Sequence, residues 1–401
     1  MRVNRPYYLE RLFSAKDEPF IKVITGVRRC GKSTLLDMLE ERLLGAGIPQ
    51  SNIVRLNFDS RETRRAATDA DSLYDLVAGR MGPGRNYVLL DEIQNIKDWE
   101  DALIFMFTDF DADLYVTGSN AMMRPPDIGS KLVGRYLDIH VLPLSFGEYL
   151  DFVPNEGELT DSFEEYVANG GFPAVALTKP ELKAAALDGI FNTILELDVS
   201  LKNEVRDKAL MRDLAEYLIE NIGCSVSFDN ITEHIERGGR TVSSNTVSNY
   251  VMMLEKAFLL YRIGRTDVKG KKRLKTLGKY YAVDTGIREM LIGSWTDDRG
   301  KIMENIVHHE LRKRGYTVSV GKVGAYEIDF IAVKQRERIY IQVAYTASDP
   351  DVLERELRPL RGTKNSYPKL LLTMDRAGPD NYDGIRNRNL MKWLLSEETS
   401  G

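Results

Sequence analysis

Cysteine and histidine are scarce in this chain. Cys30 and Cys224 are the two cysteines among 401 residues, and there are four histidines. Two cysteines can form one disulfide at most, and neither residue type occurs at a spacing typical of a metal site. The sequence therefore excludes a fold held together by several disulfides and gives no indication of a zinc centre.

Long apolar stretches and an excess of positive charge are also absent. No stretch approaches the roughly 18 consecutive apolar residues that can span a bilayer, and the N-terminal stretch MRVNRPYYLERLF lacks the apolar core of a secretory signal. We therefore expect a cytoplasmic protein without a membrane partner. The formal net charge of −5 excludes a uniformly basic surface, so any contact with nucleic acid must be local.

The pattern along the chain predicts several α/β parts. In the first third, apolar strands alternate with helical stretches, as in a parallel sheet with helices on both faces. Residues 145–222 are then helical, and residues 225–292 combine helices with short strands. We expect a helix over residues 32–44 and 303–314, and strands over residues 20–25, 52–58, 87–90, 112–117, 137–141, 317–320, 327–333, 338–343 and 369–373.

A P-loop motif follows the first expected strand. Every fixed position of G-x-x-x-x-G-K-[ST] is met, and the stretch that we expect to contact nucleotide is Gly26, Val27, Arg28, Arg29, Cys30, Gly31, Lys32, Ser33 and Thr34. Glycines let backbone N–H groups turn inward around phosphate oxygens, and the following helix adds its positive N-terminal end. We expect Lys32 to reach the β- and γ-phosphates of ATP and the Ser33 hydroxyl to bind Mg²⁺.

Two adjacent carboxylates end the strand at residues 87–90. We expect Asp91 to join the magnesium shell and Glu92 to polarise an attacking water as general base. This pair favours hydrolysis of ATP over phosphoryl transfer to a small molecule, and no Asn-Lys-x-Asp motif for reading guanine is present.

Two weaker candidates lie further along the chain. Asn120 or Ser119, after the strand at residues 112–117, is our candidate for a polar sensor beside the γ-phosphate, with a plain turn as the alternative. Arg135 could supply a cation that stabilises the transferring phosphoryl group, or it could be a surface arginine that precedes a strand.

These motifs, in this order, resemble the prokaryotic AAA+ ATPases whose C-terminal half is a domain of unknown function. The resemblance rests on residues 26–33, 89–94 (LLDEIQ), 117–120, 134–135, 143–146, 170–173 (GGFP), 245–250 and 341–345 (IQVAY). It implies an α/β fold made of an AAA+ P-loop domain at residues 1–150, a helical lid or linker at 151–222, a winged-helix unit at 223–294 and a restriction-endonuclease-like domain at 295–401. It also makes a homo-oligomer plausible, because AAA+ sites usually form between subunits.

A basic segment follows the apolar-periodic helix expected at residues 243–260. Residues 262–279 hold eight lysines and arginines against Asp267 alone, and we expect a hairpin turn at residues 269–271, within the basic hairpin Lys269–Lys275. A helix followed by a basic hairpin is how a winged helix meets phosphates. DNA is therefore a candidate partner, with a solvated loop or a contact to another subunit as the alternatives.

The last part has the order of a restriction-type nuclease core without its full chemistry. Glu304 on a helix and Asp329 on a strand match two metal-binding positions, but Gln342 and Ala344 stand where a carboxylate and a lysine belong. We therefore expect a scaffold without cleavage activity. His308 and His309, on the same helix as Glu304, are expected to pack rather than to bind metal.

The function that the sequence favours is a magnesium-dependent ATPase of the AAA+ class whose C-terminal half engages a partner. The alternative is a nucleotide-gated switch that binds DNA or protein and turns over slowly. A metal-dependent nuclease is the third hypothesis, and it depends on a site that is incomplete in the sequence.

Overall fold

The computed structural model describes residues 4–119, 132, 134–153, 157–268, 273–293 and 298–399, with the backbone alone at 273–277. The chain forms two compact units, residues 1–142 with 256–258, and residues 143–255 with 259–401. Among the described helices, none is long and apolar enough to cross a membrane.

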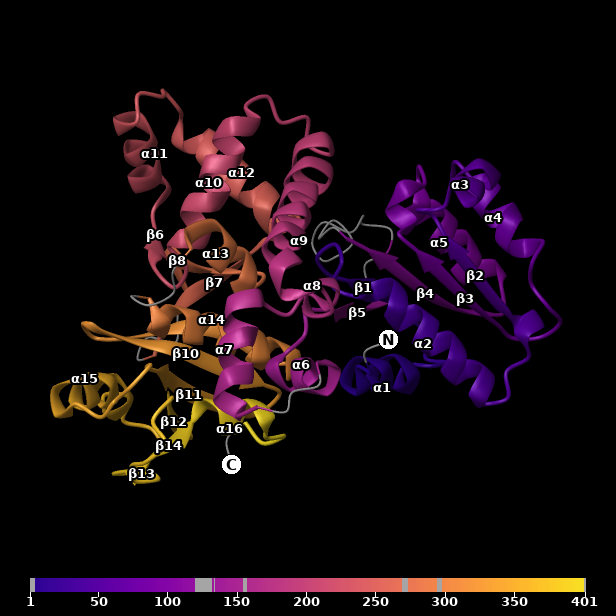
Figure 1. The fold of residues 1–401 in the computed structure, drawn as a ribbon. Helices are drawn as coiled ribbons and strands as arrows, with labels where there is room; N and C mark the ends of the chain where they lie inside the picture. Colours follow the sequence, from indigo (N-terminus) through magenta and orange to yellow (C-terminus); the bar gives the residue numbers. More distant parts are fainter. Residues whose placement is uncertain are drawn as a thin grey trace. The chain divides into compact units, whose positions relative to one another are not determined.

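The first unit is a five-stranded parallel sheet with helices on both faces. Its strands follow the order β2-β3-β4-β1-β5, and Figure 1 shows α2 on one face with α4 and α5 on the other. The elements are α1 Pro6–Ser14, β1 Ile21–Thr25, α2 Lys32–Gly45, β2 Ile53–Asn57, α3 Arg61–Ala66, α4 Ala70–Ala78, β3 Asn86–Asp91, α5 Trp99–Asp109, β4 Ala112–Gly118 and β5 Tyr136–His140.

All five strands expected in this part of the sequence are present, with each end within one residue of its expected position. Every residue of β1 and β3 is buried, because helices cover both faces of the sheet. The strand order puts β4 between β1 and β3. The carboxyl ends of these three strands therefore meet at one edge of the sheet, which is where the P-loop begins.

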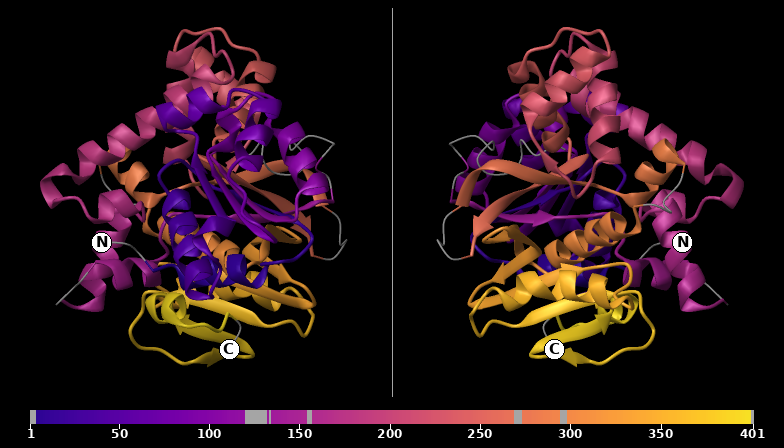
Figure 2. Two further views of the ribbon diagram at one scale, coloured as in Figure 1. Left: turned by 90° about the vertical axis from the view of Figure 1, so that its right-hand side faces the viewer. Right: turned by 90° about the vertical axis from the view of Figure 1, so that its left-hand side faces the viewer.

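The second unit contains one nine-stranded mixed sheet with the order β13-β14-β12-β11-β10-β9-β7-β8-β6. Figure 2 shows its C-terminal strands at one end of the unit and helices α11 and α12 at the other. The elements are α6 Phe146–Phe152, α7 Leu159–Asn169, α8 Pro173–Ala176, α9 Pro180–Thr193, a π-helical stretch Ile194–Leu201, α10 Lys208–Glu220, β6 Ser225–Val226, α11 Phe228–Arg237, α12 Ser244–Lys256, β7 Leu260–Asp267, β8 Arg273–Ala282, α13 Thr285–Ile292, α14 Arg299–Lys313, β9 Thr317–Val323, β10 Tyr326–Lys334, β11 Glu337–Val343, α15 Pro350–Arg361, β12 Lys369–Thr373, β13 Asn381–Tyr382, β14 Ile385–Asn389 and α16 Leu390–Leu395.

Alternation along β10 places a helix on each face of this sheet. Phe330 faces the rings of Tyr281 and His308, and His308 belongs to α14. Ile331, the next residue, packs in an apolar cluster with Leu357 of α15. Because successive side chains of a strand point to opposite faces, α14 and α15 cover opposite sides of the sheet.

The stretch Gly170–Pro173 joins α7 to α8 and packs against the buried carboxylate of Asp284. Asp284 accepts hydrogen bonds from the N–H groups of Gly171 (2.6 Å), Gly286 (2.9 Å) and Ile287 (3.3 Å). Gly170 has φ +72°, and a Cβ there would lie 1.8 Å from the Asp284 carboxylate. Glycine is therefore required by both conformation and space. Burial raises the pKa of Asp284 to about 6, although these hydrogen bonds act to lower it.

Candidate functional site

The P-loop backbone has the geometry that its two glycines were expected to allow. Gly26 and Gly31 have φ +153° and +101°, values that side-chain-bearing residues rarely adopt. A Cβ on Gly26 would also lie 2.2 Å from the carbonyl oxygen of Val141. Gly31 is followed directly by α2, which begins at Lys32. The loop therefore turns tightly into a helix N-terminus, the arrangement that binds phosphate.

Lys32 lies folded over the loop. Its Nζ donates to the carbonyl oxygens of Gly26 (3.1 Å) and Val27 (3.2 Å) and lies 3.5 Å from Oε1 of Glu92. The Lys32 side chain is 3% exposed, so the ammonium depends on these oxygens for its solvation. A triphosphate would offer stronger, charged acceptors in their place.

The two predicted carboxylates meet at the side chain of Thr117. The Thr117 hydroxyl donates to Oδ1 of Asp91 and accepts from the backbone N–H of Glu92 (2.9 Å). Asp91 is fully buried, and its Oδ2 lies 3.4 Å from a guanidinium nitrogen of Arg55. Glu92 has φ +54°, in the left-handed region, which turns its side chain away from the strand direction and toward Lys32. Strain of this kind is typical of functional positions.

Three residues of this site were missed by the sequence reasoning. Gln94 donates to Oε2 of Glu92 and lies 3.5 Å from the Ser119 hydroxyl. Arg5 donates to the carbonyl oxygens of Cys30 (3.0 Å) and Leu142 (2.9 Å), so it fixes the loop to the segment that follows β5. Arg5 precedes α1 and Arg55 lies on β2, and neither position belongs to a motif that could have identified it.

The remaining loop residues divide between burial and solvent. Val27 and Cys30 are buried, Arg28 and Thr34 are half-buried, and Arg29 and Ser33 are exposed. The Cys30 thiol donates to the carbonyl oxygen of Val141 at 3.4 Å, and burial raises the pKa of this thiol. Cys30 is therefore a neutral, buried side chain beneath the loop.

The structure places the two weaker candidates, the polar sensor at Ser119 or Asn120 and the cation Arg135, in different parts of the sheet. Ser119 is buried at the end of β4 beside Gln94, whereas Asn120 lies outside the described residues. Arg135 is exposed, and its carbonyl oxygen accepts from the N–H of Ile21, at the start of β1. The P-loop follows the other end of β1, so the structure does not bring Arg135 to the Lys32 site of its own chain. The phosphoryl-stabilising role of Arg135 stays a prediction.

The donor set fits magnesium. Mg²⁺ prefers oxygen ligands and is usually held by one or two carboxylates together with phosphate oxygens and water. Asp91 supplies a buried carboxylate at the end of β3, and Ser33 supplies a hydroxyl in the first turn of α2. Within the described part of the chain, no group of three or more His, Cys, Asp or Glu side chains forms a metal cage.

A second polar centre lies in the nine-stranded sheet. The Lys279 ammonium on β8 lies 2.8 Å from Oε1 of Glu327, 3.2 Å from Oε2 of Glu304 and 3.8 Å from Oδ1 of Asp329. Glu304 also accepts from the Tyr281 hydroxyl at 2.8 Å. Glu304 and Asp329 therefore both lie beside the Lys279 ammonium, a lysine on a different strand from the position 344 considered in the sequence.

The electrostatics of this Lys279 centre are those of a buried ion cluster. Burial raises the pKa values of Glu304 and Asp329, against the attraction of Lys279. Burial lowers the pKa of Lys279, but the surrounding carboxylates outweigh it and raise the pKa overall. Lys279 therefore stays charged and balances carboxylates that would otherwise take up protons.

Gln342 and Ala344 complete the surroundings of this centre. Gln342 accepts from the Asp329 N–H (3.4 Å) and donates to Oε2 of Glu356 (2.9 Å), so its amide is a bridge between acidic residues. Ala344 is buried directly after β11. His308 is fully buried and stacks on Tyr281 with 4.8 Å between the ring centroids, which agrees with a packing role.

The basic hairpin is only partly described. The strands β7 and β8 pair antiparallel from Leu260 with Ala282 to Thr266 with Arg273. Lys269 and the other residues of its tip, and the side chain of Lys275, lie outside the described residues. The helix before the hairpin, α12, ends at Lys256 rather than near residue 260, because Phe258 has φ +57° and the chain turns into β7.

Comparison with known proteins identifies both parts of the chain with protein families. Residues 18–150 match a family described as AAA domain, and residues 160–298 match a domain of unknown function, DUF8612. An uncharacterized protein of Haemophilus influenzae is 37% identical over 98% of both chains. An uncharacterized protein of Methanocaldococcus jannaschii is 27% identical over 84% of this chain and 77% of its own length.

Solved structures are more distant. A Walker-type ATPase of Pyrococcus abyssi covers 72% of this chain and 95% of its own, with 12% identity and a TM-score of 0.48. That similarity is too low to carry an argument about function. The match of residues 18–150, together with the P-loop and Asp91–Glu92 geometry, shows an ATP-binding P-loop domain. The chain belongs to the same family as the Haemophilus influenzae protein, and its N-terminal part is an AAA domain.

Proposed function

We propose that this protein is a magnesium-dependent ATPase of the AAA+ class, which couples ATP binding or hydrolysis to engagement of a partner by its C-terminal half. The observation that carries the ATPase proposal is the direct contact between the two predicted motifs. Lys32 of the P-loop lies 3.5 Å from Glu92, and Thr117 joins Glu92 to Asp91.

Binding of the triphosphate would rearrange these contacts. The Lys32 ammonium would exchange the carbonyl oxygens of Gly26 and Val27 for β- and γ-phosphate oxygens, with N–H groups of the loop around them. Mg²⁺, held by Ser33 and Asp91, would neutralise charge that develops on the phosphates. Once Lys32 turns to the phosphates, the Glu92 carboxylate loses its ion pair and becomes available to accept a proton.

Glu92 would then act as general base. It accepts a proton from a water molecule while the water oxygen forms a bond to the γ-phosphorus and the bond from that phosphorus to the β,γ-bridging oxygen breaks. The products are ADP and inorganic phosphate, and Glu92 returns its proton to solvent. Gln94 holds the second carboxylate oxygen of Glu92 and therefore orients the base.

Steady-state ATP turnover tests this mechanism. Lys32→Ala should lose ATP binding, whereas Glu92→Gln should retain binding and lose turnover by about 10²–10⁴-fold, the usual contribution of a general base. Glu62→Gln, at an exposed glutamate on α3, is the matched control and should leave turnover unchanged. Removal of magnesium by a chelator should abolish turnover, and full activity of the Glu92→Gln protein would refute the assignment.

We propose that the partner is DNA and that it binds to the basic hairpin formed by β7 and β8. The order α10, β6, α11, α12, β7, β8, with β6 and β7 both paired to β8, supports a winged-helix unit at residues 223–294. Exchange of Lys271, Lys272 and Arg273 for glutamate should abolish DNA retention at low salt. Unchanged retention by this triple variant would remove the hairpin from the proposal.

Two alternatives have their own tests. If the chain is a nucleotide-gated switch, ATP should change partner binding while turnover stays slow with and without DNA. If it is a nuclease, plasmid nicking should require magnesium and disappear in Asp329→Ala. The position of Lys279 among the carboxylates supports our proposal that residues 295–401 form a restriction-endonuclease-like scaffold without cleavage chemistry, since an ammonium ion already balances the acidic groups there.

A further inference from the structure

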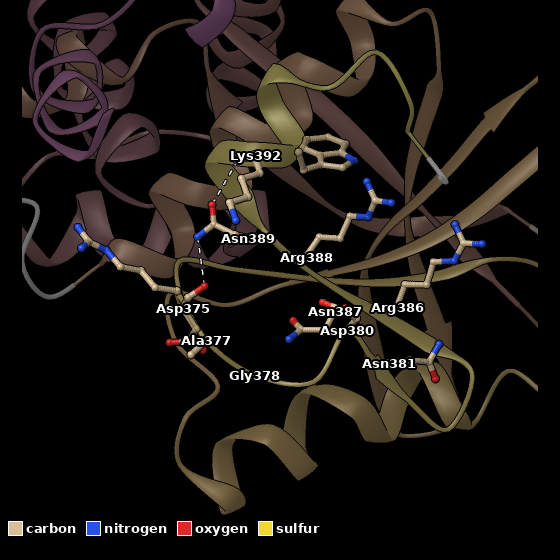
Figure 3. A pocket seen from close by; sticks show the side chains of 12 residues that line it. Asp375, Ala377, Gly378, Asp380, Asn381, Arg386, Asn387, Arg388, Asn389 and Lys392 are labelled. Atoms are coloured by element: carbon tan, nitrogen blue, oxygen red, sulfur yellow. Dashed lines mark hydrogen bonds between the residues drawn. The ribbon is translucent and has the colours of Figure 1, made fainter. Parts of the chain in front are cut away.

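A polar cavity of about 550 Å³ lies near the C-terminal end of the second unit. One wall is the loop that follows β12, from Asp375 to Asn381, and the other is β14 with the first turn of α16 (Figure 3). Gly378 in the loop has φ +149°, and a Cβ there would lie 3.4 Å from Nδ2 of Asn387. The loop therefore approaches β14 closely, and the cavity is bounded by backbone on both sides.

The lining of this cavity is positively charged, although the whole chain is acidic. Its cationic side chains are Arg376, Arg386, Arg388 and Lys392, against two carboxylates, Asp375 and Asp380. Arg376 already donates to the Thr160 hydroxyl (3.0 Å) and lies 3.6 Å from Oε2 of Glu158. Asp375 is already engaged, because it accepts from the Thr346 hydroxyl (2.6 Å) and the Ala347 N–H (2.8 Å). Figure 3 shows the guanidinium groups of Arg386 and Arg388 extending to the same side of β14, as expected for residues two apart on a strand.

The side chains of Arg388 and Lys392 have no acceptor in contact with them among the described residues. Asn387, between Arg386 and Arg388, turns to the other side of β14 (Figure 3), where its Nδ2 donates to the Pro379 carbonyl oxygen at 3.0 Å. Arg388 and Lys392 are therefore the groups that remain available to an anionic ligand.

We propose that this cavity binds a phosphorylated ligand of nucleotide size, and we call it the β14 cavity. Arginine and lysine donors from separate positions suit the several oxygens of a phosphate group, with arginine able to form two parallel hydrogen bonds. The volume lies within the range of about 300–1,000 Å³ for small-molecule sites, which is more space than a free phosphate ion fills. This site is separate from the P-loop.

Binding of AMP tests the proposal, because AMP lacks the β- and γ-phosphates that the P-loop grips. All measurements use the full chain with Lys32→Ala, so that the P-loop contributes little. We compare this protein with one that also carries Arg388→Glu and Lys392→Glu, and with a control that carries Arg336→Glu and Lys364→Glu, two exposed positions outside the cavity. A second arm uses a tetrathymidylate with a 5′-phosphate, to distinguish a free nucleotide from the end of a nucleic acid strand.

The expected result is saturable binding of at least one of the two probes. The cavity variant should bind it at least about tenfold more weakly, because two charge-assisted contacts become repulsive, and the control should match the parent. Binding of the oligonucleotide alone would assign the ligand to a strand end. Equal binding by the cavity variant, or no saturable binding of either probe, would overturn the proposal. Photocrosslinking of 8-azido-AMP to the unaltered cavity should label the peptide that spans residues 375–393, and exclusive labelling elsewhere would also overturn it.

Discussion

Lys279→Met should destabilise the second unit strongly. The Lys279 side chain is 7% exposed and lies 2.8, 3.2 and 3.8 Å from three carboxylate oxygens. At an effective dielectric constant of about 20, each pair contributes roughly 4–6 kcal/mol of Coulomb attraction before desolvation is subtracted. Removing one partner of a buried ion cluster costs about 3–5 kcal/mol in the free energy of unfolding, because the remaining charges stay buried without compensation.

Urea unfolding followed by tryptophan fluorescence measures this loss. A Trp99→Phe background removes the tryptophan of the first unit, so that the two remaining tryptophans, Trp295 and Trp393, both report on the second. The expected loss corresponds to a melting temperature lower by roughly 6–20 °C for a unit of this size. Lys322→Met, at an exposed lysine on β9, is the control and should change the stability by less than about 0.5 kcal/mol.

Two further measurements distinguish a loss of charge balance from a loss of packing as the cause of the destabilisation. Adding Glu304→Gln to Lys279→Met should restore part of the stability, because the uncompensated negative charge is smaller. The Lys279→Met protein should also gain stability as the pH falls, since its folded-state carboxyls bind protons at a higher pH than the unfolded chain does. If Lys279→Met unfolds at the same urea concentration as the parent, the reasoning about the Lys279 centre is wrong.

Three other substitutions have defined outcomes. Gly26→Ala should abolish ATP binding in a fluorescent-nucleotide titration, since its Cβ would meet the Val141 carbonyl oxygen at 2.2 Å; binding as tight as in the parent would contradict the loop geometry. Thr117→Val should retain ATP binding but lower turnover by at least about tenfold, because the buried Asp91 and the Glu92 N–H lose their shared hydroxyl; unchanged turnover would show that this bridge is not needed. Burial raises the pKa of Asp284 to about 6 in the folded protein, above its usual value of 3.8, so its contribution to stability rises as the pH falls from about 7 to 4. Asp284→Asn should therefore remove that part of the pH dependence in melting curves. Parallel curves for the two proteins would show that Asp284 titrates normally.

The first unit could be predicted from the sequence in considerable detail. Its strands are short apolar runs, and its expected nucleotide-binding residues belong to contiguous motifs. Lys32, Asp91 and Glu92 could therefore be assigned to the ends of particular strands from the sequence alone. Arg5 could not be predicted, because its role depends on a contact with the carbonyl oxygen of residue 142, which is distant in sequence. The same applies to Arg55, whose partner Asp91 lies on the neighbouring strand.

The polar centre of the second unit was harder to predict, because it also depends on contacts between residues that are distant in sequence. Glu304 and Asp329 were identified from their order along the chain, but the lysine was sought at position 344, two residues after Gln342. The structure supplies Lys279 instead, from a strand that the sequence indicated only as part of a basic hairpin. The pairing of β7 with β9 joins the hairpin to the rest of the sheet, and a long-range pairing of this kind leaves no local pattern in the sequence.

Strand β8 has a mechanical consequence for any partner that binds the hairpin. It runs from Arg273, next to the tip, to Ala282, and it carries Lys279 and Tyr281 in between. Its register against β7 shifts between Lys279 and Leu274, and a shift of this kind bends the strand that carries the extra residues. A partner bound at the tip would therefore be joined to the Lys279 centre by a bent strand rather than by a continuous ladder.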